Sequence, residues 1–147
     1  MAGFSIVWPT LALVALIWIV WFRMFQKRIA HLKANPPTGD TFRTSESALR
    51  YFQPVEMPAN NFANLFEMPV LYFALVALLL VSGQATVAQT ILACLYVAFR
   101  VLHSWEHGGA NRVPIRFRWY LMSCAVLLAM WIGFAIDFGF ATIGRYI

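Results

Sequence analysis

Charged residues are scarce in this sequence. Asp, Glu, Lys and Arg make up only 12% of its 147 residues, about half their share in a soluble globular domain, whereas 61% of the residues are hydrophobic. Between Met68 and Phe99 none of these four residue types occurs over 32 residues. The composition argues against a soluble protein and predicts an integral membrane protein, and the length suits one compact domain, residues 1-147, without room for a second.

Cysteine is scarce as well, with two residues in the chain. Cys94 and Cys124 both lie within apolar runs and show no metal-binding spacing, which argues against a disulfide framework and against a cysteine-based metal site. We expect both side chains to act as packing residues in the membrane-embedded part of the chain.

Turn signals divide the apolar sequence into four helices. The uncharged run from Met68 to Phe99 would measure about 48 Å as one helix, which is too long for a single span, and Ser82-Gly83-Gln84 interrupts it. The expected transmembrane helices cover about residues 4-25, 61-81, 85-105 and 115-137. The first is expected to continue out of the membrane toward Ala34, followed by a structured loop of about 25 residues. The predicted fold is an all-α, four-helix transmembrane bundle.

Acidic residues are fewer than basic ones, six against eleven, for a net charge of +5. The basic residues flank apolar runs, where they set topology and face anionic lipid headgroups, so they do not indicate nucleic-acid binding. Ten of the eleven fall on the side of the first and third connections between helices, and Arg145 falls on the other side. The positive-inside rule predicts that these connections are cytoplasmic and that both termini lie on the opposite side.

Polar side chains gather where three of the expected helices begin or end on the cytoplasmic side. Their spacing places them on one face of each helix. The groups are Asn64 and Glu67 at the start of the second helix, Arg100, His103 and His107 at the end of the third, and Arg116 and Tyr120 at the start of the fourth. A carboxylate together with several guanidiniums suits a small zwitterion that carries an amine and carboxylates. The alternative is an ion-pair network that only ties the helix ends together, with Glu67 marking the water interface.

A metal-binding pattern overlaps this cluster. The segment His103-Ser-Trp-Glu106-His107 fits H-x-x-E-H, in which two histidines hold zinc and the glutamate acts as base. Zinc needs a further protein ligand, and Asp137 is expected at the far face of the membrane. We therefore expect no metal, with Glu106 and His107 capping the helix end in the headgroup region.

The segments NLFEMP (64–69), RVLHSWEH (100–107) and NRVPIRFRWY (111–120) resemble those of the MAPEG superfamily, the membrane-associated proteins of eicosanoid and glutathione metabolism. The resemblance covers nearly the whole chain, and the three segments occur in the right order, helix and depth. It implies four transmembrane helices, a homotrimer, and a glutathione site between neighbouring subunits on the cytoplasmic side.

The resemblance also implies roles for single residues. Asn64 and Glu67 match the N-x-x-E that holds the glutamyl end of glutathione, Glu67 through the amine. Arg100 and His103 match an R-x-x-H that reaches the peptide's carboxylates and backbone. Arg116 matches an arginine near the thiol, with Arg112 from the turn as a second candidate. Tyr120 matches a ring, and Arg28 or Lys27 matches a basic residue at the end of the first helix.

The chemistry implied is thiolate formation. A free thiol has a pKa of about 8.5, and an adjacent arginine favours the thiolate. The resemblance then predicts a glutathione-dependent transferase or peroxidase that attacks lipophilic electrophiles or lipid hydroperoxides entering from the bilayer, with glutathione as cosubstrate.

Four positions depart from the eicosanoid-type members. Asn60 and Ala63 stand where those enzymes have arginines, His107 where they have a tyrosine, and Phe117 where the prostaglandin branch has a serine proposed as catalytic. Each missing charged hydrogen bond would weaken glutathione binding by about 1.5–3 kcal/mol. Prostaglandin E synthesis is therefore not expected. The alternative function is a non-catalytic membrane protein of the same fold, either an assembly partner or a binder of another small anion.

Overall fold

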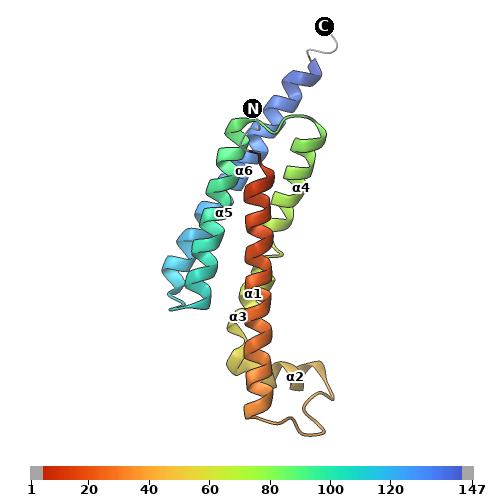
Figure 1. The fold of residues 1–147 in the computed structure, drawn as a ribbon, viewed down its shortest axis with the longest axis vertical. Coiled ribbons are helices and arrows are strands. Elements are labelled where there is room, and N and C mark those ends of the chain that lie inside the picture. The colour runs from red at the N-terminus through yellow and green to blue at the C-terminus, as the bar shows by residue number, and fades with distance from the viewer. Residues whose placement is uncertain (1–4, 144–147) are drawn as a thin grey trace.

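The computed structural model describes residues 5–143 of the chain, and the side chains as far as residue 141. Within this part all regular structure is helical (Figure 1). The helices are α1 (Val7–Ala34), α2 (Ser45–Phe52), the 3-10 helix η1 (Gln53–Val55), α3 (Met57–Asn64), α4 (Met68–Val81), α5 (Val87–Gly108) and α6 (Val113–Ile143). The expected start of the first helix at Phe4 and the basic residue Arg145 lie outside the described residues.

Four helical stretches of the described chain are long and apolar enough to cross a membrane. They are Val7–Ala34, Met57–Val81, Val87–Gly108 and Val113–Ala141. The expectation of four long apolar helices is therefore confirmed. The first runs through Ala34, and the last extends well beyond the expected residue 137.

The second stretch is not the continuous helix 61-81 that the sequence analysis expected. It is two helices, α3 and α4, separated at Leu65–Glu67. Pro69, the second residue of α4, explains the break, because proline lacks a backbone N–H and its ring collides with the carbonyl four residues earlier. Glu67, two residues before Pro69 and at the cap of α4, is non-helical, with φ −86° and ψ −94°, and the helix begins again at Met68.

The helices form a bundle in which α5 and α6 run side by side in opposite directions, with α1 alongside (Figure 1). The start of α1 and the α4–α5 connection lie at one end of the bundle, near the far end of α6. The α5–α6 turn and the α1–α3 segment point toward the other end. The two connections that carry most of the basic residues therefore face the same way.

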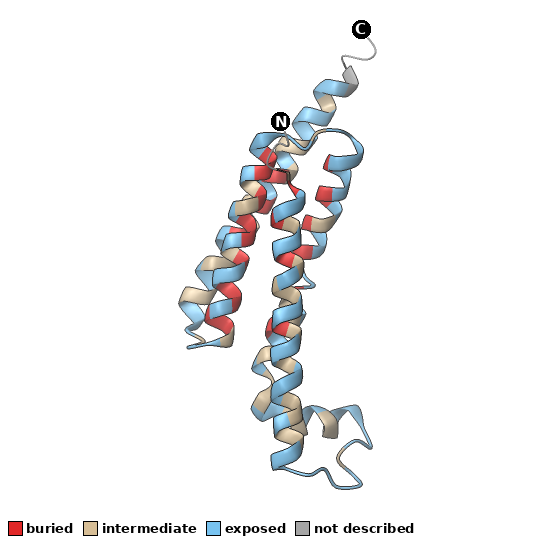
Figure 2. Cartoon of the chain, in the orientation of Figure 1, coloured by how far each residue is buried: buried red, intermediate tan, exposed pale blue. Residues whose placement is uncertain are grey.

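The core lies between the helices (Figure 2). Leu13, Tyr72, Tyr96 and Met130 are fully buried members of one apolar cluster drawn from α1, α4, α5 and α6. The rings of Tyr72 and Tyr96 stack at 4.8 Å, and the Tyr72 hydroxyl lies 3.0 Å from the hydroxyl of Thr10. Large apolar side chains on the outside of the bundle, such as Trp8 and Val81, are mostly exposed, as expected for surfaces that face lipid or another subunit.

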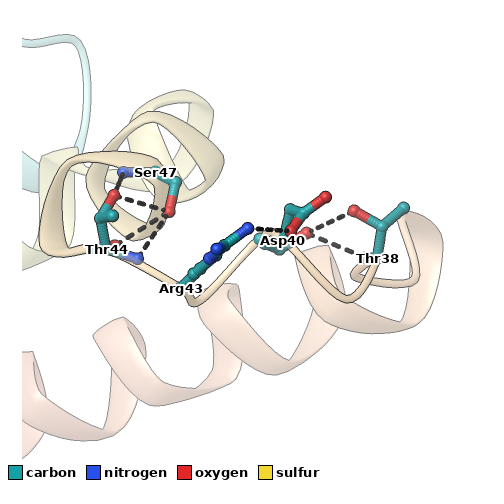
Figure 3. A network of polar contacts seen from close by, with 6 residues as sticks. Thr38, Asp40, Arg43, Thr44 and Ser47 are labelled. Atoms are coloured by element: carbon teal, nitrogen blue, oxygen red, sulfur yellow. Dashed lines mark hydrogen bonds and ion pairs between the residues drawn. The ribbon is translucent and has the colours of Figure 1, made fainter.

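The connection after α1 folds back onto the end of that helix. The rings of Tyr51 and Phe52 from α2 pack against His31, and the Tyr51 hydroxyl donates to the carbonyl of Asn35. Short-range polar contacts shape the rest of the connection (Figure 3): Thr38 with Thr41, Arg43 with Asp40, and a capping box between Thr44 and Ser47 at the start of α2.

Candidate functional site

The polar side chains of three helices meet around one pocket of about 200 Å³. It lies where α3 ends, α5 ends and α6 begins. Its walls are formed by Asn64, His103, His107, Val113, Arg116, Phe117 and Tyr120. Residues 64 and 120, far apart in sequence, thus share one small polar space.

Asn64 links the two charged residues on its side of the pocket. The Arg100 Nη2 atom donates to both the backbone carbonyl and the Oδ1 of Asn64, each at 2.8 Å. The Asn64 Nδ2 atom in turn donates to Glu67 Oε2 at 3.1 Å. The helix break explains this arrangement, because Asn64 is the last residue of α3 and its carbonyl is available to a side chain from another helix. The i, i+3 pairing expected for Asn64 and Glu67 is thus achieved across a break rather than along a helix.

Arg100 is the most unusual group at this site. Its side chain is fully buried, with its guanidinium carbon 5.8 Å from the centre of the Tyr120 ring. Its Nε and Nη1 atoms have no hydrogen-bond partner, and the ion pairs of the described residues do not include it. A buried charge without a counterion is costly. Arg100 therefore places a positive charge without a direct ion pair behind the pocket wall made by Asn64 and Tyr120.

His103 connects α5 to α6. Its Nδ1 atom lies 3.0 Å from the backbone carbonyl of Arg116. A carbonyl oxygen only accepts, so Nδ1 carries the proton and, in the neutral ring, Nε2 carries the lone pair. The His107 ring packs edge-on against it at 5.7 Å, so two imidazoles form one side of the pocket.

Arg116 is held by a residue that the sequence analysis passed over. Its Nη1 atom donates to Asn111 Oδ1 at 2.7 Å. Asn111 lies in the α5–α6 connection with φ 51°, in the left-handed region that asparagine tolerates better than most residues. An asparagine five residues before Arg116 was the available clue, but the sequence analysis included it only as the first residue of the segment 111–120.

The structure brings most of the predicted site residues together. The pocket is lined by Asn64, His103, Arg116 and Tyr120, and Arg100 lies buried directly behind it. Glu67 is exposed and lies at the pocket edge, where it accepts the hydrogen bond from Asn64. His107 and Phe117, which the sequence analysis singled out as departures from related enzymes, line it as well.

Two predicted residues lie outside this pocket. Arg112 makes a two-armed ion pair with Glu106, Nε to Oε1 at 2.8 Å and Nη2 to Oε2 at 3.0 Å, and its backbone N–H also donates to Oε1. The Glu106 carboxylate raises the pKa of Arg112 above its usual value, so the arginine stays charged but is already paired. Arg28 lies over the Phe52 ring, 5.0 Å from its centre, on the extension of α1.

The H-x-x-E-H segment does not form a metal cluster in the described chain. No group of three or more His, Cys, Asp or Glu side chains there is arranged to hold a metal ion. Glu106, the would-be base, is instead engaged by Arg112.

Four helices that are long and apolar enough to cross a membrane, with a pocket where α3 and α5 end and α6 begins, define a small polytopic membrane protein. The model of the MAPEG family matches residues 6–136, which is most of the sequence. The chain belongs to the MAPEG family. No curated protein and no solved structure gives a significant match to it.

Proposed function

We propose that this protein is a glutathione-dependent transferase or peroxidase acting on lipophilic electrophiles or lipid hydroperoxides in the membrane. One observation carries the proposal: the buried, unpaired charge of Arg100 stands behind a pocket that Asn64 connects to a carboxylate, Glu67. Glutathione carries two carboxylates and an amine, so its charges complement this arrangement.

The roles follow from the positions of the side chains. Glu67, exposed at the pocket edge, binds the amine of the glutamyl group. Asn64 and the positive charge of Arg100 receive a carboxylate. Arg116, on the α6 side of the pocket, lies beside the thiol and favours the thiolate. The sulfur then bonds to the electrophile as the leaving group departs. With a hydroperoxide, the thiolate attacks the terminal oxygen, the O–O bond breaks, and the lipid leaves as an alcohol after taking up a proton. The glutathione sulfenic acid that forms condenses with a second glutathione to give the disulfide and water.

A second subunit would complete the site. The pocket of one chain measures about 200 Å³, whereas pockets for small molecules commonly measure about 300–1,000 Å³. Family membership and the exposed apolar faces of the helices support the homotrimer expected from the resemblance. Arg28 and the end of α1 would then approach the pocket of a neighbouring copy, and the basic end of the bundle would face the cytoplasm.

Phe117 favours the rival function, a non-catalytic member that binds another small anion or serves as an assembly partner. It places a large apolar ring in the pocket where the prostaglandin branch has a serine, and Ala63 and Asn60 add no charge nearby.

Measuring turnover by the detergent-purified protein distinguishes the enzyme from the non-catalytic alternative. With glutathione and a lipophilic electrophile, or with a lipid hydroperoxide, we expect product formation above the uncatalysed rate and saturation with glutathione. Glutathione binding without turnover of either substrate class would contradict the enzyme and support the anion binder. The absence of both would support the assembly partner.

A further inference from the structure

Two arginines, Arg112 in the α5–α6 connection and Arg116 in the first turn of α6, are held in two different ways. Glu106 binds Arg112 through both of its carboxylate oxygens, so that guanidinium is neutralised where it stands. Arg116, four residues later, is bound by an amide, the Oδ1 of Asn111. Only the second of these arginines lines the pocket.

Asn111 is itself fixed from several directions. Its backbone N–H donates to the Glu106 carbonyl at 2.8 Å, which closes the turn. Its Nδ2 atom donates to the sulfur of Met57, the first residue of α3, at 3.7 Å. Arginine has only donors, so the amide oxygen must face Arg116 and the amide nitrogen must face Met57. The side chain therefore has one orientation, tied to α3 on one side and to α6 on the other.

A neutral amide orients an arginine without reducing its charge. The guanidinium has five N–H donors, and the contact with Asn111 uses one. The ion pair between Arg112 and Glu106 shows the other way to fix an arginine. A carboxylate also holds the guanidinium in place, but its negative charge offsets the positive charge. Arg116 is also anchored at its backbone, where His103 donates to its carbonyl.

We propose that Asn111 is the positioning residue that aims the full positive charge of Arg116 at the thiol of bound glutathione. This inference rests on the proposed function. It assigns the thiolate chemistry to a pair, Arg116 as the group near the sulfur and Asn111 as the residue that orients it while leaving its charge intact.

Other charged and titratable groups face Arg116 and contribute to any pH dependence at the site. They are His103, His107, Arg100 and Glu106 from α5, Arg112 from the connection, Tyr120 from α6, and Glu67, which contacts Asn64. None of them is altered in the test below, so a difference between variants reports on position 111.

The test compares Asn111 with Asn111→Gly and Asn111→Asp in the full-length, detergent-purified protein. Asparagine, glycine and aspartate are the residues that best tolerate a positive φ, so all three suit the backbone of this turn. Glycine removes the oxygen that orients Arg116. Aspartate keeps that oxygen and adds a negative charge. The readouts are the ultraviolet absorbance of the glutathione thiolate as a function of pH, kcat together with the KM values for glutathione and for the lipophilic electrophile, and thermal unfolding.

We expect Asn111→Gly to move the midpoint of thiolate formation up by about one pH unit and to lower kcat about tenfold, the size of one charged hydrogen bond. We expect Asn111→Asp to produce a shift at least as large, because it neutralises Arg116. The KM for glutathione and the unfolding temperature should change little, since the variants leave Glu67, Asn64 and Arg100 in place.

Overlapping thiolate titrations and equal kcat values for the three proteins would overturn the inference and reduce Asn111 to a turn residue, while leaving the proposed function standing. If the wild-type chain binds no glutathione, the proposed function fails and this inference fails with it. The two failures are therefore distinguishable.

Discussion

Replacing Arg116 with alanine is expected to lower the rate of glutathione conjugation about a hundredfold while leaving glutathione bound. Arg116 lines the pocket, and its contacts there are to neutral groups, Asn111 through the side chain and His103 through the backbone carbonyl. Its charge is therefore available to a thiolate. Removing one preorganised donor from the site of a developing negative charge commonly costs about 10²–10³ in kcat.

Arg118→Ala is the matched control for this variant. Arg118 lies two residues further along α6, is exposed, and does not line the pocket. Arg118→Ala removes the same charge from the same helix as Arg116→Ala does, but from outside the pocket. We therefore expect the kcat of Arg118→Ala to match that of the wild-type chain. Equal losses in both variants would show a general electrostatic effect of the basic helix end. An unchanged kcat in Arg116→Ala would contradict the role given to Arg116.

Replacing Asn64 with leucine is expected to cause the largest combined loss of stability and binding. The Asn64 side chain is the acceptor for a fully buried guanidinium and the donor to Glu67. Leucine leaves Arg100 with only the backbone carbonyl of residue 64 as partner. A charged hydrogen bond is worth about 1.5–3 kcal/mol, so we expect the free energy of unfolding to fall by that amount and glutathione affinity to fall tenfold or more.

A double variant separates the loss of stability from the loss of glutathione binding. In Asn64→Leu with Arg100→Met, the buried charge is gone and an apolar side chain of similar length fills its place, which commonly restores stability. We expect the unfolding free energy of the double variant to return close to that of the wild-type chain, while glutathione binding stays lost. If binding returns together with stability, neither residue recognises glutathione.

The positions of the membrane helices were largely predictable because the polar breaks are abrupt. Ser82-Gly83-Gln84 separates two long apolar runs, and the structure places the α4–α5 connection there. The break before α4 was missed, since the sequence analysis expected one helix over residues 61-81 and gave no weight to Pro69. A proline inside a long apolar stretch acts through backbone sterics, which hydropathy does not report.

The candidate site was predictable as a set of residues but not as a set of contacts. The helical spacing of Arg100, His103 and His107 indicated one face, and all three are buried at that end of α5. Spacing alone did not show that Glu106 would engage Arg112, because Glu106 lies in α5 and Arg112 lies in the connection after it, whose geometry includes the positive φ of Asn111.

The most direct test of the account is equilibrium binding of glutathione to the purified protein, measured beside Glu67→Gln and Glu56→Gln. Glu67 contacts Asn64 at the pocket edge, whereas Glu56 precedes α3 and does not line the pocket. We expect the wild-type chain and Glu56→Gln to bind glutathione equally, at micromolar to low-millimolar concentration, and Glu67→Gln to bind about tenfold more weakly, because its amide no longer neutralises the ligand's amine. Absence of binding by the wild-type chain at 10 mM glutathione, a free energy of about 3 kcal/mol or less, would contradict the account.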